Sequence, residues 1–225
     1  MERLNEILSC IGNAGVVADI GCDHGKLEGM LLRSGRAQKV IATDISEKSL
    51  HKAVMACTGS VFEGRVEFRL GDGLAVLAPG EADVIVIAGM GGEQMADILK
   101  RGLTAARTAK LVLCPHSHEG RLRRFLLENG YFILQESLAM EEGRYYQILC
   151  AGHDGNAHSQ KDDFFYEIGF KLLQSGHPLL RGFLESKLAK TNKIIANAAR
   201  SDKENAAKQA KKLSAFAKRL EEQLK

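Results

Sequence analysis

The first 150 residues alternate between short apolar runs and stretches of helical patterning, and this alternation limits the chain to few folds. Each run is too short for a helix, and residues 83–88 are nearly all apolar, which is typical of a strand buried on both faces. We expect strands over 16–20, 39–43, 66–70, 83–88 and 110–114, and helices over 24–33, 47–57, 93–101 and 119–128. This order predicts an α/β fold with a doubly wound, mostly parallel sheet.

The alternation stops after residue 130. Residues 131–140 and 144–150 are two further strands, and Glu141-Glu142-Gly143 between them leaves no room for a helix. The sequence therefore predicts a β-hairpin, seven strands in all, and an antiparallel edge. This ending is usual in methyltransferases that use S-adenosylmethionine (SAM), whereas a dinucleotide-binding dehydrogenase more often continues with βα units. We expect a Rossmann-like class I methyltransferase domain over residues 1–152.

The rest of the chain is predicted to be a linker and a helical tail. Residues 153–160 are polar and turn-rich, and residues 161–225 form the tail. A first helix over 162–174 ends before Gly176 and Pro178. Two helices with heptad seams follow, and Ser201-Asp202-Lys203-Glu204 between them matches a capping box. The seams contain Leu184, Leu188, Thr191, Ile195 and Ala198, then Ala206, Ala210, Leu213, Ala217, Leu220 and Leu224. We expect an antiparallel coiled-coil hairpin.

Basic residues are concentrated in this tail. Residues 181–219 hold eleven Lys and Arg against three acids, although the whole chain has a net charge of only +3. Such a segment can follow the phosphates of a nucleic acid without reading its sequence. A solvated helical surface and a dimerising coiled coil are the alternatives. The short, Ala-rich second seam favours an intramolecular hairpin, so we predict a monomer more readily than a dimer.

The remaining composition argues against several classes of protein. Hydrophobic residues make up 45% and charged residues 26%, the balance of a soluble globular protein. No apolar run approaches the roughly 20 residues that cross a bilayer, and the beginning of the sequence lacks a signal-peptide pattern. We therefore expect a cytoplasmic protein without membrane contact. The five cysteines form no C-x-x-C pair, which indicates reduced, buried thiols and no bound metal.

The strongest motif lies at the end of the first expected strand and has the spacing D-x-G-x-D-x-G. It contains Asp19, Gly21, Cys22, Asp23, His24 and Gly25, and the dinucleotide fingerprint G-x-G-x-x-G is absent. Glycine lets a ligand approach the backbone closely. Carboxylates here would repel a pyrophosphate but attract the sulfonium and ammonium groups of SAM. A tight turn with capping acids is the alternative.

Three further motifs follow later strands. Asp44, which precedes Ile45, could accept hydrogen bonds from ribose hydroxyls, and Asp72, between Gly71 and Gly73, could accept one from an adenine amino group. The loop Ala88-Gly89-Met90-Gly91-Gly92 exposes backbone where doubly wound folds bind ligands and could hold a flat base against Met90. Alone, each motif is also a cap, a turn or a plain connector. The predicted SAM-binding residues are Asp19, Gly21, Cys22, Asp23, Gly25, Asp44, Ile45, Gly71, Asp72, Gly73, Ala88, Gly89 and Met90.

The segments Asp19-Ile20-Gly21-Cys22-Asp23-His24 and Ala88-Gly89-Met90-Gly91-Gly92, with the helical tail, resemble the TrmK family of bacterial tRNA methyltransferases. The similarity runs along the whole chain and includes Arg3-Leu4. It implies transfer of a methyl group from SAM to N1 of the adenine at tRNA position 22. Two segments depart from the family. Lys26-Leu27-Glu28 stands where an aromatic residue and Leu-Pro are usual, and Cys114-Pro115-His116 stands for Gln-Pro-Asn.

The implied reaction demands positioning rather than a strong base, because adenine N1 has an in-plane lone pair that can attack the methyl group directly. The product is cationic, so a carboxylate should stabilise it, and N1 lies on the pairing edge, so the base must be extruded. We predict catalytic roles for Asp23, His24 and Met90. Predicted tRNA contacts are Arg3, Lys26, Gly91, Gly92, His116, Lys187, Lys190, Lys193, Arg200, Lys208, Lys211 and Lys212.

Two other functions fit the same residues. A SAM-dependent methyltransferase for a small molecule would need a lid over its site and no basic tail. A non-catalytic protein that binds SAM and RNA is compatible with the altered segment Cys114-Pro115-His116.

Overall fold

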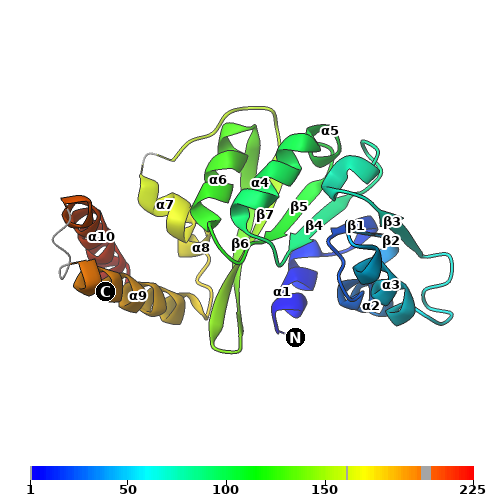
Figure 1. Cartoon of the computed structure of the whole chain (residues 1–225), viewed down its shortest axis with the longest axis horizontal. Coiled ribbons are helices and arrows are strands. Elements are labelled where there is room, and N and C mark those ends of the chain that lie inside the picture. The colour runs from blue at the N-terminus through cyan, green and yellow to red at the C-terminus, as the bar shows by residue number, and fades with distance from the viewer. Residues whose placement is uncertain (1, 161, 199–203) are drawn as a thin grey trace. The chain divides into compact units, whose positions relative to one another are not determined.

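The structure is a computed structural model that describes residues 2–160, 162–198 and 204–225, with the backbone alone for residues 204–209. The chain forms two compact units, residues 1–171 and residues 172–225. The first unit contains the sheet with its helices, and the second is built of helices (Figure 1).

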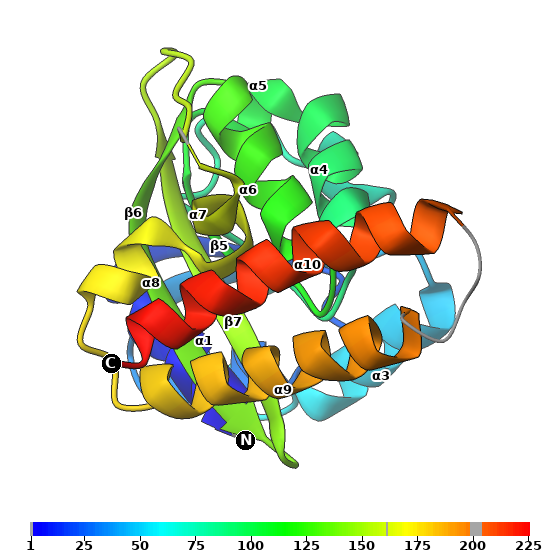
Figure 2. The same cartoon turned by 90° about the vertical axis from the view of Figure 1, so that its left-hand side faces the viewer.

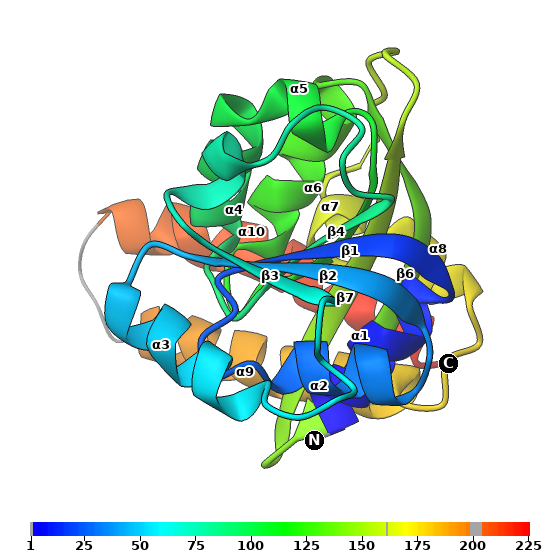
Figure 3. The ribbon, with the colours of Figure 1, turned by 90° about the vertical axis from the view of Figure 1, so that its right-hand side faces the viewer.

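The first unit is built on a seven-stranded sheet of order β3-β2-β1-β4-β5-β7-β6, which confirms the predicted fold class. The strands are β1 (Ala14–Ile20), β2 (Ala37–Asp44), β3 (Val66–Leu70), β4 (Val84–Ala88), β5 (Lys110–Cys114), β6 (Tyr131–Glu141) and β7 (Arg144–His153). Strands β1 to β5 are parallel, and Figure 3 shows β1, β2 and β3 side by side.

The hairpin forms an antiparallel edge of the sheet, as expected. Its second strand, β7, lies between β5 and β6 and is antiparallel to both. The hairpin folds back so that its second strand pairs with β5, and its first strand becomes the edge. The hairpin tip is thereby brought next to the ends of the central strands.

Helices cover both faces of the sheet (Figure 1). On one face, α1 (Glu2–Ile11) and α2 (Lys26–Arg33) bury Ile7 and Leu31 against β1, β2 and β4. On the other, α4 (Gly92–Arg101) and α6 (Glu119–Glu128) bury Leu99 and Leu122. The set is completed by α3 (Glu47–Ala56), α5 (Leu103–Ala106) and the 3-10 turn η1 (Gly73–Val76). The sequence analysis did not anticipate α1, α5 or η1.

The helix expected over residues 162–174 is broken at Gly169, whose φ is 100°. It forms α7 (Asp163–Ile168) and α8 (Phe170–Gln174). The buried Arg123 side chain donates to the Tyr166 carbonyl at 2.8 Å and to Glu136 Oε1 at 2.5 Å. These bonds join α6, β6 and α7, and residues 162–171 lie in the compact unit of the sheet. The functional boundaries at 152 and 160 stay a prediction.

The second unit contains α9 (Leu180–Ala198) and α10 (Glu204–Gln223), which lie side by side (Figure 2). They are antiparallel, because Arg181 Nη1 at the beginning of α9 donates to the Leu224 carbonyl at 3.4 Å. The expected seam residues Leu184, Thr191, Ala217 and Leu220 are buried. The expected capping box lies outside the described residues except for Glu204, at which α10 begins.

All five cysteines are free and buried, as expected. In the parts of the chain that the structure describes, no helix has the length and apolar character needed to cross a membrane.

Candidate functional site

A cavity of about 470 Å³ opens at the carboxyl ends of β1 to β4. Strand β1 has β2 on one side and β4 on the other, so the cavity lies where the strand order reverses, the usual ligand site of doubly wound folds. Every predicted SAM-binding residue except Gly25 lines it, namely Asp19, Gly21, Cys22, Asp23, Asp44, Ile45, Gly71, Asp72, Gly73, Ala88, Gly89 and Met90.

The two glycines of the first motif have different tasks. Gly21 has a φ of 85°, and a side chain there would collide with the Met90 methyl group. The turn after β1 and the loop after β4 therefore meet closely at Gly21. Gly25 has a φ of 68° and lies outside the cavity lining, where an added Cβ would come within 3.0 Å of the Ala53 backbone. Gly25 thus serves the packing of α2 against α3.

The carboxylate of Asp44 shapes the turn that carries Asp23. It accepts hydrogen bonds from the backbone N–H groups of Ser46 at 2.8 Å and of Asp23 at 3.3 Å. The second bond supports Asp23 in a left-handed conformation with a φ of 47°. Asp23 Oδ2 lies 2.5 Å from His24 Nδ1, with both side chains at least half exposed. The structure thus places a carboxylate–imidazole pair at the mouth of the cavity.

Two further acidic residues, Asp19 and Glu28, are buried at the inner wall of the cavity. Asp19 lines the cavity but is only 5% exposed, and Glu28 behind it is fully buried. Burial raises the pKa of Asp19 to about 7, with a smaller contribution from the Asp44 charge. Burial and then the charge of Asp19 raise the pKa of Glu28 well above its usual range. The inner wall of the cavity therefore carries two carboxyl groups that resist ionisation.

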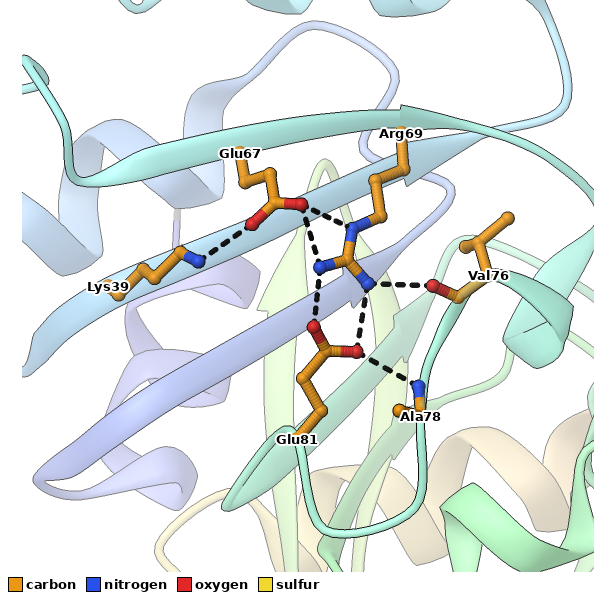
Figure 4. A network of polar contacts seen from close by, with 6 residues as sticks. All are labelled: Lys39, Glu67, Arg69, Val76, Ala78 and Glu81. Atoms are coloured by element: carbon orange, nitrogen blue, oxygen red, sulfur yellow. Dashed lines mark hydrogen bonds and ion pairs between the residues drawn. The ribbon is translucent and has the colours of Figure 1, made fainter.

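A network of hydrogen bonds and ion pairs around Arg69 stabilises the loop after β3 (Figure 4). The Arg69 guanidinium donates to the Val76 carbonyl at 2.7 Å and to Glu81 Oε1 at 2.5 Å, and Glu67 links it to Lys39. On the same loop, Asp72 is paired with Arg101 of α4. These contacts hold Asp72 at the rim of the cavity. Asp72 follows β3 and Asp23 follows β1, and β2 lies between these two strands in the sheet.

The predicted substrate residues Gly91, Gly92 and His116 do not line the cavity. The Gly92 N–H donates to the Ser117 carbonyl at 2.8 Å, and an added Cβ on Gly92 would lie 2.5 Å from the His118 carbonyl oxygen. The His116 N–H donates to the Met90 carbonyl at 3.0 Å, and its side chain is exposed. These residues join the loops after β4 and β5, and the close packing of the two loops requires a glycine at position 92.

Arg3 and Lys26, the other predicted substrate residues of this unit, do line the cavity. The Arg3 guanidinium lies over the Tyr146 ring, 5.0 Å from its centroid, and 3.7 Å from Glu141. Arg144 lies over the same ring at 5.3 Å and donates to the His116 carbonyl at 2.6 Å. The sequence did not predict that the β6–β7 hairpin contributes to the rim of the cavity. The hairpin reaches the rim because β7 pairs with β5, between β5 and β6. Missed lining residues include Leu4, Gln94 and Glu141.

In the second unit, the predicted tRNA residues Lys190, Lys193, Lys211 and Lys212 are exposed. The ammonium group of Lys187 lies 5.7 Å from the centroid of the Phe183 ring. Arg200 and the side chain of Lys208 lie outside the described residues. Among the described residues of the chain, no cluster of three or more His, Cys, Asp or Glu could hold a metal ion.

Residues 1–149 match the family described as "Methyltransferase domain". The Bacillus subtilis (strain 168) protein "tRNA (adenine(22)-N(1))-methyltransferase" is 35% identical over 153 residues, which are 67% of this chain and 63% of that protein. A Mycoplasma pneumoniae protein, named as a candidate tRNA methyltransferase, is 34% identical over 134 residues, 59% of this chain and 61% of its own. The matched region thus spans somewhat less than two thirds of these relatives.

Solved structures match over the full chain. The B. subtilis m1A22 tRNA methyltransferase TrmK has a TM-score of 0.86 at 28% identity, with 100% of this chain and 98% of that chain covered. A candidate tRNA (m1A22) methyltransferase from Streptococcus pneumoniae, solved in complex with S-adenosyl-L-methionine, has a TM-score of 0.84 at 26% identity, with 100% and 99% covered. The resemblance inferred from the motifs is confirmed.

Proposed function

Since the chain belongs to the family of methyltransferase domains, we propose that it transfers a methyl group from SAM to N1 of the adenine at position 22 of tRNA. The observation that carries this proposal is the convergence of Asp19, Asp44 and Asp72 on one cavity at the reversal of strand order. The likeness to proteins named for this reaction supports the choice of substrate.

The lining of the cavity fits SAM. Carboxylates at the ends of three neighbouring strands suit a ligand with a positive end, two ribose hydroxyls and an adenine amino group. Asp19 would bind the ammonium group, Asp44 the ribose hydroxyls and Asp72 the adenine amino group. Gly21 has a φ of 85°, a conformation that other residues rarely adopt, and it leaves the backbone of this turn uncovered where the cofactor would pass. When bound, SAM supplies a methyl group on a sulfonium, an excellent leaving group.

This chain's own residues would position the adenine and stabilise charge. N1 becomes cationic as it is methylated, and a preorganised carboxylate stabilises developing positive charge. Asp23 has its carboxylate at the cavity mouth, where His24 holds it at 2.5 Å. The Met90 side chain offers an apolar surface for the flat base. Extrusion of the base costs a few kcal/mol, which contacts to the tRNA backbone must supply.

Basic groups at two places would make these contacts. At the cavity rim they are Arg3 and Lys26, and in the second unit they include Lys190, Lys193, Lys211 and Lys212. Lysine and arginine that neutralise phosphates provide affinity without sequence selection. We propose that the chain acts on tRNA in the cytoplasm as a monomer.

Incubation of the protein with bulk tRNA, small metabolites and SAM labelled in its methyl group tests the proposal. Label in tRNA supports it, label only in metabolites supports a small-molecule methyltransferase, and binding without transfer supports a non-catalytic RNA-binding protein. A transcript with guanosine in place of the adenine at position 22 serves as the control. The account requires that this substitution abolish the transfer, and equal labelling of both transcripts would exclude position 22 as the target.

A further inference from the structure

Glu28 is an acidic residue at a buried position, where an ionised side chain is unfavourable. Its side chain is fully buried in the first turn of α2, and neither carboxyl oxygen accepts a hydrogen bond from an N–H or O–H group of the described residues. Its one side-chain hydrogen-bond contact is with the Asp19 carboxyl group, and this contact requires a proton on one of the two acids. An ionised carboxylate without partners in such a place costs several kcal/mol. The methyl-transfer chemistry described above makes no use of Glu28.

The surroundings of Glu28 supply no positive charge. The titratable groups that interact with it are Asp19 on β1, Cys22 in the turn after β1, and Cys57 at the end of α3. Burial raises the pKa of both thiols, which are therefore neutral near pH 7. Asp19 in turn faces Glu28 and Asp44. Arg33 acts on Cys57, and Arg3 and Lys26 line the cavity, but within the described residues no cation acts on Asp19 or Glu28 themselves.

The two carboxyl groups differ in access to the cavity. Asp19 lines the cavity and retains 5% exposure, whereas Glu28 retains none. Deeper burial disfavours the charged form more strongly. Asp19 lies between the cavity and Glu28, so a cation in the cavity would stabilise the charge of Asp19. The proton of such a pair therefore belongs on Glu28.

We propose that Glu28 is a positioning residue that remains protonated and donates its hydrogen bond to Asp19, which it thereby holds ionised toward the cation of the cofactor. This inference rests on the proposed binding of SAM. A donor behind Asp19 stabilises the carboxylate form, orients its oxygens and needs no cation of the protein. The cofactor would then supply the one positive charge that the inner wall of the cavity lacks.

The proposal predicts how cofactor affinity depends on pH. Burial raises the pKa of Asp19 to about 7, so below pH 7 the binding of a cation must first release a proton. SAM affinity should then fall about tenfold for each unit of pH well below 7. Removal of the donor would raise this pKa further and move the loss of affinity to higher pH.

The test is the dissociation constant of SAM between pH 5.5 and 7.5 for the wild type, Glu28→Gln and Glu28→Leu. The Gln amide keeps a donor and carries no charge, so its pH profile should coincide with that of the wild type. Leu has no donor, and we expect at least about a tenfold loss of affinity at pH 7. A Glu28→Leu profile equal to the wild type would overturn the proposal, as would a Glu28→Gln profile moved to lower pH, because Glu28 would then carry a charge.

An infrared measurement on the protein without cofactor gives an independent readout. At pH 8, where Asp19 is mostly ionised, the wild type should show the carbonyl band of a buried protonated carboxyl group, and Glu28→Gln should lack it. Absence of the band in the folded wild type would contradict the proposal even if Glu28→Leu fails to fold. A wild type that shows the band but does not bind SAM would instead refute the proposed function.

Discussion

The two compact units of the chain place their charged residues in opposite ways. In residues 1–171, Arg123 and Glu136 form a buried ion pair, and Asp19 and Glu28 are buried beside the cavity. In residues 172–225, the lysines of α9 and α10 are mostly exposed. Removal of one partner of a buried ion pair strongly destabilises a protein, whereas exposed cations can exchange counterions for phosphates. The first unit should therefore respond to substitution in its stability and cofactor binding, and the second in its binding of tRNA.

The largest expected effect is on Arg123. Arg123→Ala should lower the free energy of unfolding by about 3–5 kcal/mol, because the buried Glu136 carboxylate would lose the guanidinium group with which it forms an ion pair. Thermal and urea unfolding measure this loss. Arg124→Ala, next to it in the sequence, is the control, since its ion pair with Asp163 is exposed and should contribute about 0–1 kcal/mol. Equal losses in the two variants would show that the buried network does not anchor α7.

Asp44 should give the next largest effect. Asp44→Ala should weaken SAM binding by about 1–3 kcal/mol through the loss of charge-assisted hydrogen bonds. It would also remove the acceptor of the Asp23 N–H, so the rate of methyl transfer should fall as well. Isothermal calorimetry with Asp97→Ala, an exposed acid on α4, provides the comparison. An unchanged dissociation constant would remove Asp44 from the site.

Glu81 should have a smaller effect that depends on pH. Arg69 lowers the pKa of Glu81 to about 2, so the folded state binds fewer protons than the unfolded chain. The stability from this pair is present above pH 5 and is lost as the pH falls from about 4.5 towards 2. Glu81→Gln should cost about 1–2 kcal/mol at pH 7, a value reduced by partial solvent screening. Its unfolding free energy should also fall less steeply in acid, and an identical acid profile would contradict the role of Arg69.

The smallest expected effect concerns two lysines of α10. Lys211→Ala with Lys212→Ala should leave unfolding and SAM binding unchanged. The slope of log affinity for tRNA against log salt should fall by about 1–2, since each phosphate contact contributes roughly 0.7–0.9. Lys100→Ala on α4 controls for loss of charge in general. If the slope is the same for the wild type and the double variant, these lysines do not contact phosphates.

The sequence predicted the sheet well because buried strands leave a clear signal. The bounds of β3 and β5 agree with the expected ones. Strand β5 is a short, mostly apolar run, and β3 alternates the apolar Val66, Phe68 and Leu70 with charged residues. It missed α1, although Leu4, Ile7 and Ile11 recur at helical spacing. It also placed one helix where Gly169 separates two, because a glycine inside a helical pattern is tolerated in many other chains.

The sequence predicted the part of the site that follows the ends of the parallel strands. It did not predict the part that the β6–β7 hairpin contributes. Motifs after parallel strands meet at one edge of the sheet, so the residues from Asp19 to Met90 converged as expected. Arg144 and Tyr146 reach the rim only because β7 pairs with β5, which no local pattern indicates. Glu28 stood out as a departure from the family, but only the structure reveals that it is buried beside Asp19.

The central claim is that residues 1–171 bind SAM and that residues 172–225 bind tRNA. The most direct test compares tRNA methylation by a protein of residues 1–171 with tRNA methylation by the full chain. A cut after residue 171 keeps the Tyr166 carbonyl that Arg123 requires, whereas a cut near His158 would remove it. At saturating SAM, the shortened protein should keep its affinity for SAM and show a KM for tRNA at least about tenfold higher, with a flatter salt dependence. Equal KM values and salt slopes would contradict a tRNA-binding role for residues 172–225.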